Sequence, residues 1–169
     1  MKLSRSDLKL GIIDKTVIFN PNILPERNIH FLNNKIECII SSRKKTSKDF
    51  NINGKLFLKV KYECVRCLND NIIDHKLPFD LDILSFDKKI DNDCDKFDFI
   101  QLKENENHID LSKVFADIIA LAKPIKHLCS SECLGICIIC GKDKNKISCS
   151  CTISHQSNAW DDLKKLNIK

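Results

Sequence analysis

Cysteines are the residues of this chain that are best placed to do chemistry. Eight of the ten fall into four close pairs: Cys64 with Cys67, Cys129 with Cys133, Cys137 with Cys140, and Cys149 with Cys151. Two cysteines a few positions apart can direct both sulfurs at one ion from a single turn of backbone. Since a tetrahedral site needs two such pairs, the sequence predicts two four-sulfur metal sites.

The pair with the most specific sequence is Cys137-Ile-Ile-Cys140, which is followed directly by Gly141. A glycine there lets the backbone turn and aim amides at the sulfurs. The nearby Cys149 and Cys151 are its natural partners, which leaves Cys64, Cys67, Cys129 and Cys133 for a second ion. The two other combinations of pairs remain open, because spacing alone does not separate them.

Zinc is the ion that we expect, with about two ions per chain. Residues 1–10 contain no apolar secretory segment, so we place the chain in a reducing compartment, where disulfides do not persist. Four thiolates close the coordination sphere of zinc, which favours a structural site over a catalytic one. Rubredoxin-type iron at Cys137, Cys140, Cys149 and Cys151 is an alternative, and His127 or His155 could replace one sulfur.

The remaining cysteines and the motif inventory give no sign of catalysis. Cys38 alternates with apolar positions and is expected to be a buried small residue, and Cys94 is expected to have no role. The chain has no glycine-rich phosphate loop, no His-Glu-x-x-His and no nucleophile with a base beside it. We therefore expect a protein that is not an enzyme.

Composition indicates a globular protein with a modest positive charge. The 169 residues are 43% hydrophobic and 30% charged, with a formal net charge of +5, which does not by itself indicate a nucleic-acid binder. Four basic residues on or beside the cysteine turns nevertheless form a candidate phosphate-binding surface: Arg66, Lys142, Lys144 and Lys146. No membrane segment is visible.

Alternating apolar and polar residues predict the strands that carry the first cysteine pair. The clearest strands are 55–63 and 77–83, and Pro78 indicates a sheet edge. They flank Cys64-Val-Arg-Cys67, so this pair is expected at the tip of a long hairpin. Shorter strand candidates are 36–41, 16–19 and 97–102, and 87–98 reads as a polar loop.

The period changes to that of a helix from Leu111 to Ala122, with Asp110 as its expected cap and Pro124 as its stop. A short amphipathic segment around Trp160 ends the chain. The fold class is therefore α+β: a mostly antiparallel sheet or partial barrel with one packed helix and a C-terminal zinc-binding ribbon. We divide it into 1–122, sheet plus helix, and 123–169, the ribbon, packed as one unit through Cys64 and Cys67.

The order of these motifs resembles the YceD family of large-subunit ribosomal RNA accumulation proteins of bacteria and plastids. The resemblance runs from about Leu56 to the C-terminus and rests on these segments: Cys64-Val-Arg-Cys67, Ile109-Asp-Leu-Ser112, Ala122-Lys-Pro124, Cys129 to Cys133-Leu-Gly-Ile-Cys137, Cys140-Gly141 and Cys149-Ser-Cys151. Ile138 stands where the family commonly has proline, and 157–160 replaces an acidic-Pro-Arg step. Neither departure touches an expected ligand.

The resemblance implies a non-enzymatic, cytoplasmic bacterial factor for large-subunit (23S-type) ribosomal RNA accumulation and ribosome assembly. Its partner would be ribosomal RNA or a large-subunit assembly protein. Two other functions fit the cysteines, namely a rubredoxin-like electron carrier and a zinc-ribbon partner of a transcription complex. Metal analysis distinguishes the electron carrier, which would hold one reversible iron instead of about two zinc ions. Co-purification with RNA polymerase rather than with large-subunit precursors would indicate the transcription partner.

Overall fold

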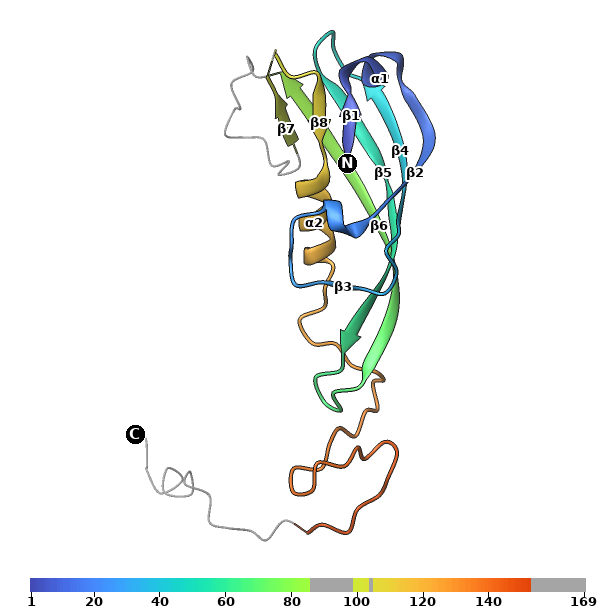
Figure 1. The fold of residues 1–169 in the computed structure, drawn as a ribbon, viewed down its shortest axis with the longest axis vertical. Coiled ribbons are helices and arrows are strands. Elements are labelled where there is room, and N and C mark those ends of the chain that lie inside the picture. The colour runs from blue at the N-terminus through green and yellow to red at the C-terminus, as the bar shows by residue number, and fades with distance from the viewer. Residues whose placement is uncertain (86–98, 104, 153–169) are drawn as a thin grey trace, which may run out of the picture.

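The computed structural model describes residues 1–85, 99–103 and 105–152. A six-stranded sheet forms the larger part of the described structure (Figure 1), in the order β2-β4-β5-β6-β7, and β3 pairs with the end of β5. The strand bounds are Ile12–Phe19 for β2, His30–Phe31 for β3, Ile36–Lys44 for β4, Phe50–Glu63 for β5, Asp70–Ser85 for β6 and Phe99–Leu102 for β7. All pairs are antiparallel except β6 with β7, so the mostly antiparallel prediction is confirmed.

The hairpin of β5 and β6 contains the two longest strands of the sheet. Its register runs without a break from Phe50 opposite Ile83 to Glu63 opposite Asp70. Both strands begin earlier than their alternation predicts, at Phe50 rather than Lys55 and at Asp70 rather than Leu77. No residue of 70–76 is buried, so this part of β6 has no core-facing side that alternation could reveal. It is a strand because its backbone pairs with β5.

Pro78 lies on an open side of β6, as the sequence predicts. Its partner across the hairpin is Lys55, and in the described residues β7 pairs only with Asp82 to Ser85 of β6. The proline therefore needs no amide hydrogen for a second neighbouring strand at this position.

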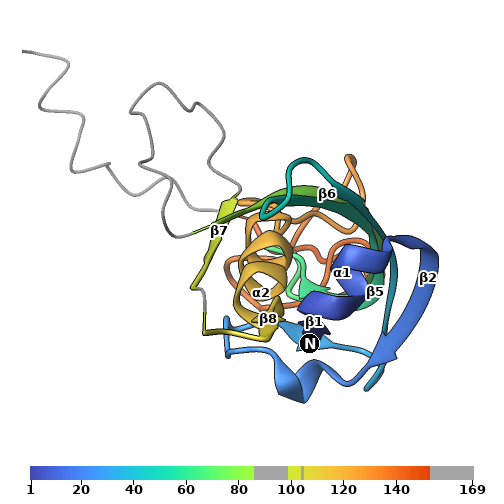
Figure 2. The ribbon, with the colours of Figure 1, turned by 90° about the horizontal axis from the view of Figure 1, so that it is seen from above.

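The sheet curls around helix α2, Ser112–Leu121, as the view from above shows (Figure 2). Phe115 on the buried face of α2 lies 6.1 Å from the ring of Phe19 in β2 and 5.0 Å from the ring of Phe79 in β6. One aromatic side chain thus joins two strands that are not neighbours in the sheet. The sheet stays open rather than closing into a barrel.

The cap of α2 differs in detail from the prediction. Leu111 occupies the N-cap position, and Asp110 accepts a hydrogen bond of 2.9 Å from the backbone N–H of Ser112. Asp110 therefore satisfies one of the free amides of the first turn from one position further out. The helix ends at Leu121, three residues before Pro124.

Four small elements have no counterpart in the sequence prediction. Strand β1, Lys2–Ser4, pairs with β8, His108–Asp110, and helix α1, Arg5–Leu10, follows β1. A 3-10 turn covers Pro21–Ile23. Leu3 of β1 and Leu8 of α1 are buried in the main core.

The described part of the C-terminal region, residues 123–152, contains no helix or strand and consists of turns around the cysteines. Its first residues run beside the end of the β5–β6 hairpin, and most of it lies beyond the hairpin tip (Figure 1). The segment around Trp160, the whole loop predicted at 87–98 with Cys94, and His155 lie outside the described residues. Within the described part of the chain, no helix has the length and apolarity needed to cross a membrane.

Candidate metal centres

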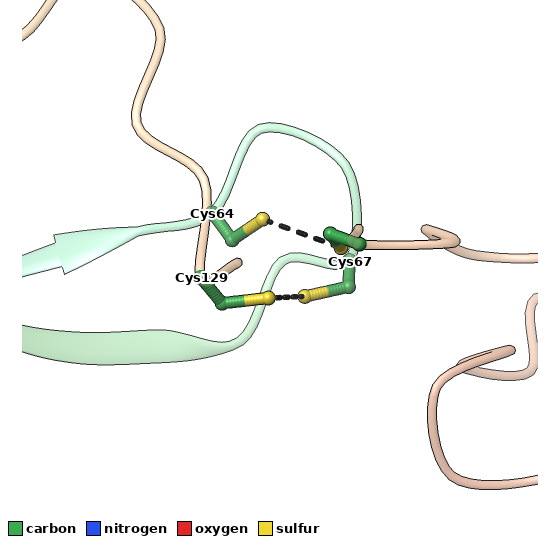
Figure 3. Close-up of side chains that lie close together, drawn as sticks. Cys64, Cys67 and Cys129 are labelled. Atoms are coloured by element: carbon green, nitrogen blue, oxygen red, sulfur yellow. Dashed lines mark hydrogen bonds between the residues drawn. The ribbon is translucent and has the colours of Figure 1, made fainter. Parts of the chain in front are cut away.

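The tip of the β5–β6 hairpin and the chain after α2 together form the first four-sulfur group, made by Cys64, Cys67, Cys129 and Cys133. All four sulfurs lie within 4.8 Å of one another. The Cys64 and Cys133 sulfurs are 3.8 Å apart, and those of Cys67 and Cys129 are 3.6 Å apart. Figure 3 shows Cys67 and Cys129 with their sulfurs facing each other and Cys64 on the same hairpin tip.

Backbone hydrogen bonds shape the hairpin tip so that both of its cysteines face one point. The Cys64 N–H donates to the Asn69 carbonyl, and the Leu68 N–H donates to the Cys64 carbonyl, each at 2.9 Å. Leu68 adopts a left-handed conformation with φ 60°, which closes the turn. An irregular turn of this kind can direct two sulfurs to the same side.

The chain after α2 is held against the hairpin tip by main-chain contacts. The Val65 N–H donates to the His127 carbonyl at 2.9 Å, and the Ile136 N–H donates to the Arg66 carbonyl at 3.0 Å. These bonds lie on either side of Cys129 and Cys133 along the chain. The position of the second cysteine pair is therefore fixed by backbone as well as by the sulfurs.

The first group is sheltered from solvent. Cys64, Cys67 and Cys133 are buried and pack with the half-buried Leu128, whereas Cys129 is exposed. These cysteines form a small cluster separate from the main core under the sheet. An ion held there would join two parts of the chain that the main core does not join.

The second four-sulfur group is local to the C-terminal ribbon and is made by Cys137, Cys140, Cys149 and Cys151. The Gly141 N–H donates to the Cys137 carbonyl at 2.8 Å, and Gly141 has φ 70°. This is the turn expected of Cys-x-x-Cys-Gly. Cys137 is buried, whereas Cys140 and Cys151 are exposed, so this group is more open than the first.

Each group contains one thiol that ionises readily and one that resists ionisation. Burial opposes ionisation of Cys64, but the amides of Cys67, Arg66 and Cys129 outweigh it and lower the pKa of Cys64 to about 6. The backbone amides of Cys140 and Ile139 lower the pKa of Cys137 to about 6. The Cys129 thiol donates to the sulfurs of Cys133 and Cys67, and the Cys151 thiol donates to that of Cys140. These bonds stabilise the protonated thiols and raise the pKa of Cys129 and Cys151 to about 12. A bound cation would replace the protons that these thiols share.

The spacing of the sulfurs suits a tetrahedral ion. Zinc–sulfur bonds of about 2.3 Å place tetrahedral sulfurs about 3.8 Å apart, close to the 3.8 and 3.6 Å of the first group. None of the described cysteines is in a disulfide. The eight sulfurs thus form two groups that could hold metal ions, in the combination that the order of pairs predicts.

The four basic residues singled out from the sequence have different environments. Arg66 donates to the Cys133 carbonyl at 3.0 Å, and Lys146 lies 3.4 Å from Asn69 Oδ1. Arg66 thus contacts a cysteine of the first group directly, and Lys146 contacts an asparagine that lies against the Cys67 sulfur. Lys142 and Lys144 are exposed, and their side chains have no hydrogen bond or ion pair within the described residues.

Two of the other predicted residues can also be placed. Cys38 is fully buried in β4, as predicted, and burial raises its pKa to about 12. His127 belongs to neither sulfur group: its ring lies 5.4 Å from that of Tyr62, and its buried Nε2 has no hydrogen-bond partner among the described residues. It does not replace a sulfur in this structure.

Sequence reasoning missed Asn69, Asp143 and Asn145. The Asn69 and Asn145 carboxamides lie 3.3 Å and 3.4 Å from the sulfurs of Cys67 and Cys133. Asparagine is common in turns for other reasons, so only the position of Asn69 two residues after a ligand could have suggested this role.

Comparison with known families bears on these cysteine turns. A family model described as "Large ribosomal RNA subunit accumulation protein YceD" matches residues 52–167, which contain both sulfur groups. The chain belongs to the YceD family. The resemblance drawn from the order of the cysteine motifs is thereby confirmed, and the family description supports a role in large ribosomal RNA subunit accumulation.

A curated relative supports the same membership. The Arabidopsis thaliana protein named "Large ribosomal RNA subunit accumulation protein YCED homolog 1, chloroplastic" is 34% identical over 58 residues. That alignment covers 34% of this chain and 18% of the relative, so most of the relative lies outside the match. No solved structure matches the chain.

Proposed function

We propose that this YceD family member is a non-enzymatic zinc-binding factor required for accumulation of large-subunit (23S-type) ribosomal RNA during ribosome assembly. The observation that carries the proposal is the family match over 52–167, which spans both four-sulfur groups. It works in the compartment where the large subunit is assembled, the bacterial cytoplasm or its plastid equivalent.

The choice of zinc rests on the donor set. Four thiolates suit both zinc and iron, but a protein that acts by holding a shape needs no redox couple. Four protein ligands leave no coordination position open for water, which fits a structural ion. The proposal accordingly gives the protein no catalytic residue.

The surface proposed to contact the partner is the basic part of the ribbon. Lys142 and Lys144 are exposed on a loop whose backbone is fixed at both ends: the Cys137 N–H donates to the Lys142 carbonyl, and the Lys144 N–H donates to the Gly135 carbonyl. A rigid loop presents its side chains at little cost in ordering. Ribosomal RNA is the partner that two unpaired lysines favour, and a large-subunit assembly protein is the other outcome of the test.

Depletion of the protein in its own cells tests the proposal. We expect 23S-type RNA to fall relative to small-subunit RNA, and the tagged protein to sediment with large-subunit precursors. Restoration by the wild-type gene, but not by a Cys67→Ser, Cys133→Ser gene expressed at equal level, would connect the effect to the first sulfur group. Unchanged RNA ratios on depletion, or sedimentation with RNA polymerase instead, would overturn the proposal.

A further inference from the structure

Two asparagine carboxamides donate hydrogen bonds to sulfurs of the first group. Asn69 Nδ2 lies 3.3 Å from the Cys67 sulfur, and Asn145 Nδ2 lies 3.4 Å from the Cys133 sulfur. Cys67 belongs to the hairpin tip and Cys133 to the chain after α2, so each half of the group has one side-chain donor. Donors of this kind reduce the charge on metal-bound thiolates and hold them in place.

One carboxylate joins the two carboxamides. Asp143 Oδ2 accepts from Asn69 Nδ2 at 2.6 Å, and Asp143 Oδ1 accepts from Asn145 Nδ2 at 2.8 Å. An ionised carboxylate only accepts hydrogen bonds, so it attracts the NH₂ end of each amide and not the carbonyl end. Because an NH₂ group has two hydrogens, the second one of each amide is free to point at a sulfur.

The carbonyl ends of both amides are engaged as well. Asn145 Oδ1 accepts from the Leu134 N–H at 2.8 Å, and Lys146 Nζ lies 3.4 Å from Asn69 Oδ1. Asn145 is thus oriented by a backbone amide and by Asp143. Asn69 depends more on Asp143, because its other partner is an exposed lysine.

Asp143 is itself firmly held. Donation from the backbone N–H of Asn145 and the side chain of Asn69 lowers the pKa of Asp143, which keeps its carboxylate ionised. It lies in a short antiparallel bridge opposite Ile136, on the loop between the Cys137–Cys140 turn and Cys149. A residue from the ribbon of the second group therefore serves the first group.

We propose that Asp143 is the positioning residue of the first metal centre: it turns the Asn69 and Asn145 carboxamides so that both donate to metal-bound thiolates, and so slows loss of the ion. The inference rests on the metal binding proposed above. It adds a physical link between the two centres, because a change in the ribbon loop would reach Cys67 and Cys133 through this carboxylate.

Cobalt(II) is a suitable probe because its bonds to sulfur absorb light. The full-length chain is loaded with cobalt, and the sulfur-to-cobalt charge-transfer band and the release of cobalt to a chelator are recorded. We expect Asp143→Ala to shift the band of the first centre to lower energy, since its thiolates lose donors. Release from that centre should be about tenfold faster, the lower end of the effect of removing an outer-shell partner.

Asp70→Ala is the matched control. Asp70 begins β6 at the same hairpin end and pairs with Lys61 at 2.7 Å, and the carboxamide NH₂ groups donate to Asp143 and the sulfurs rather than to Asp70. Asp70→Ala removes the same charge and the same atoms as Asp143→Ala but leaves both carboxamides oriented. We therefore expect a wild-type band and release rate. Asp143→Asn keeps one acceptor oxygen and should give an intermediate rate.

A mutant cycle separates positioning from mere support of the loop. In an Asn69→Ala, Asn145→Ala background, Asp143→Ala should add little to the release rate, because no carboxamide remains to be oriented. A full tenfold effect in that background, or a wild-type band and rate for Asp143→Ala alone, would overturn the inference. If Asp143→Ala does not fold, Asn69→Ala alone must shift the band, and no shift would overturn it. Failure of the wild type to bind cobalt would instead reject the proposed metal binding.

Discussion

The sulfurs of Cys64 and Cys133 lie 3.8 Å apart, although 69 positions separate the two residues in the chain. Between them lie β6, β7, β8 and α2, so this contact closes a loop that contains much of the fold. An ion at the first group would therefore restrain the ribbon against the hairpin tip. The second group closes only a short local loop within the ribbon.

Metal removal should loosen the ribbon and spare the sheet. The main core under the sheet is separate from the cysteine cluster, so β5 and α2 do not depend on an ion for their burial. We expect chelation to increase hydrogen exchange at the amides of Val65 and Ile136, with β5 amides near Leu56 unchanged. Exchange that rises equally in β5 would contradict the separation of the two clusters.

Two ribbon glycines with the same backbone conformation make a matched pair of substitutions. Gly135 has φ 72° and Gly141 has φ 70°. A Cβ at Gly135 would lie 3.0 Å from the Arg66 carbonyl oxygen, whereas a Cβ at Gly141 meets nothing within 4 Å. We expect Gly141→Ala to cost about 1 kcal/mol of zinc-bound stability from backbone strain and Gly135→Ala about 2–3 kcal/mol. Denaturant unfolding in excess zinc measures both, and equal losses would contradict the contact with Arg66.

His75 should make stability depend on pH. Its Nε2 lies 3.0 Å from the Tyr62 hydroxyl, and burial lowers its pKa below the usual 6.5. The folded state therefore favours neutral His75, and this contribution is present above pH 6.5 and is lost as pH falls through the lowered pKa. We expect His75→Gln to lose less stability than wild type between pH 7 and pH 5.

Urea unfolding with zinc at saturating concentration gives that comparison. His108→Gln serves as the matched histidine control, because His108 is exposed in β8. A wild-type pH dependence in His75→Gln would show that the Tyr62–His75 contact is not the titrating element.

The exposed lysines of the ribbon should control binding to RNA. If Lys142 and Lys144 contact phosphates, replacing both with alanine should weaken binding to large-subunit RNA and reduce the slope of log affinity against log salt by about 1–2. Lys9→Ala with Lys113→Ala is the charge-matched control on α1 and α2. Filter binding at several salt concentrations measures the slopes, and equal slopes in the two double variants would reject this surface.

The predictable part of the fold was the part in which local pattern and burial agree. Leu56, Leu58, Val60 and Tyr62 alternate and are all buried, and Phe115 and Ile119 follow the helical period and are buried in α2. The first part of β5 was missed because Gly54 interrupts the pattern. A Cβ there would lie 2.1 Å from the Ile39 carbonyl oxygen and 2.7 Å from the Phe79 ring, so the strand depends on the glycine.

The elements that could not be predicted depend on partners far along the chain. Strand β1 is three residues long, and its pairing with β8 joins Lys2 to Asp110, a contact that no local pattern indicates. The cysteine groups were predictable because sulfurs two to four positions apart have few other uses inside a cell. Asp143 was not, because its role appears only when the hairpin tip and the ribbon are brought together.

The number of bound metal ions distinguishes two separate zinc centres from every alternative. Native mass spectrometry of the purified chain, with elemental analysis, should find two zinc ions per molecule. Cys67→Ser should retain the ion of the ribbon and lose the other, whereas Cys149→Ser should do the reverse, with cobalt spectra of the two variants distinguishing the centres. A single iron with a reversible redox couple, a metal-free chain, or loss of both ions from either variant would contradict the account of two separate zinc centres.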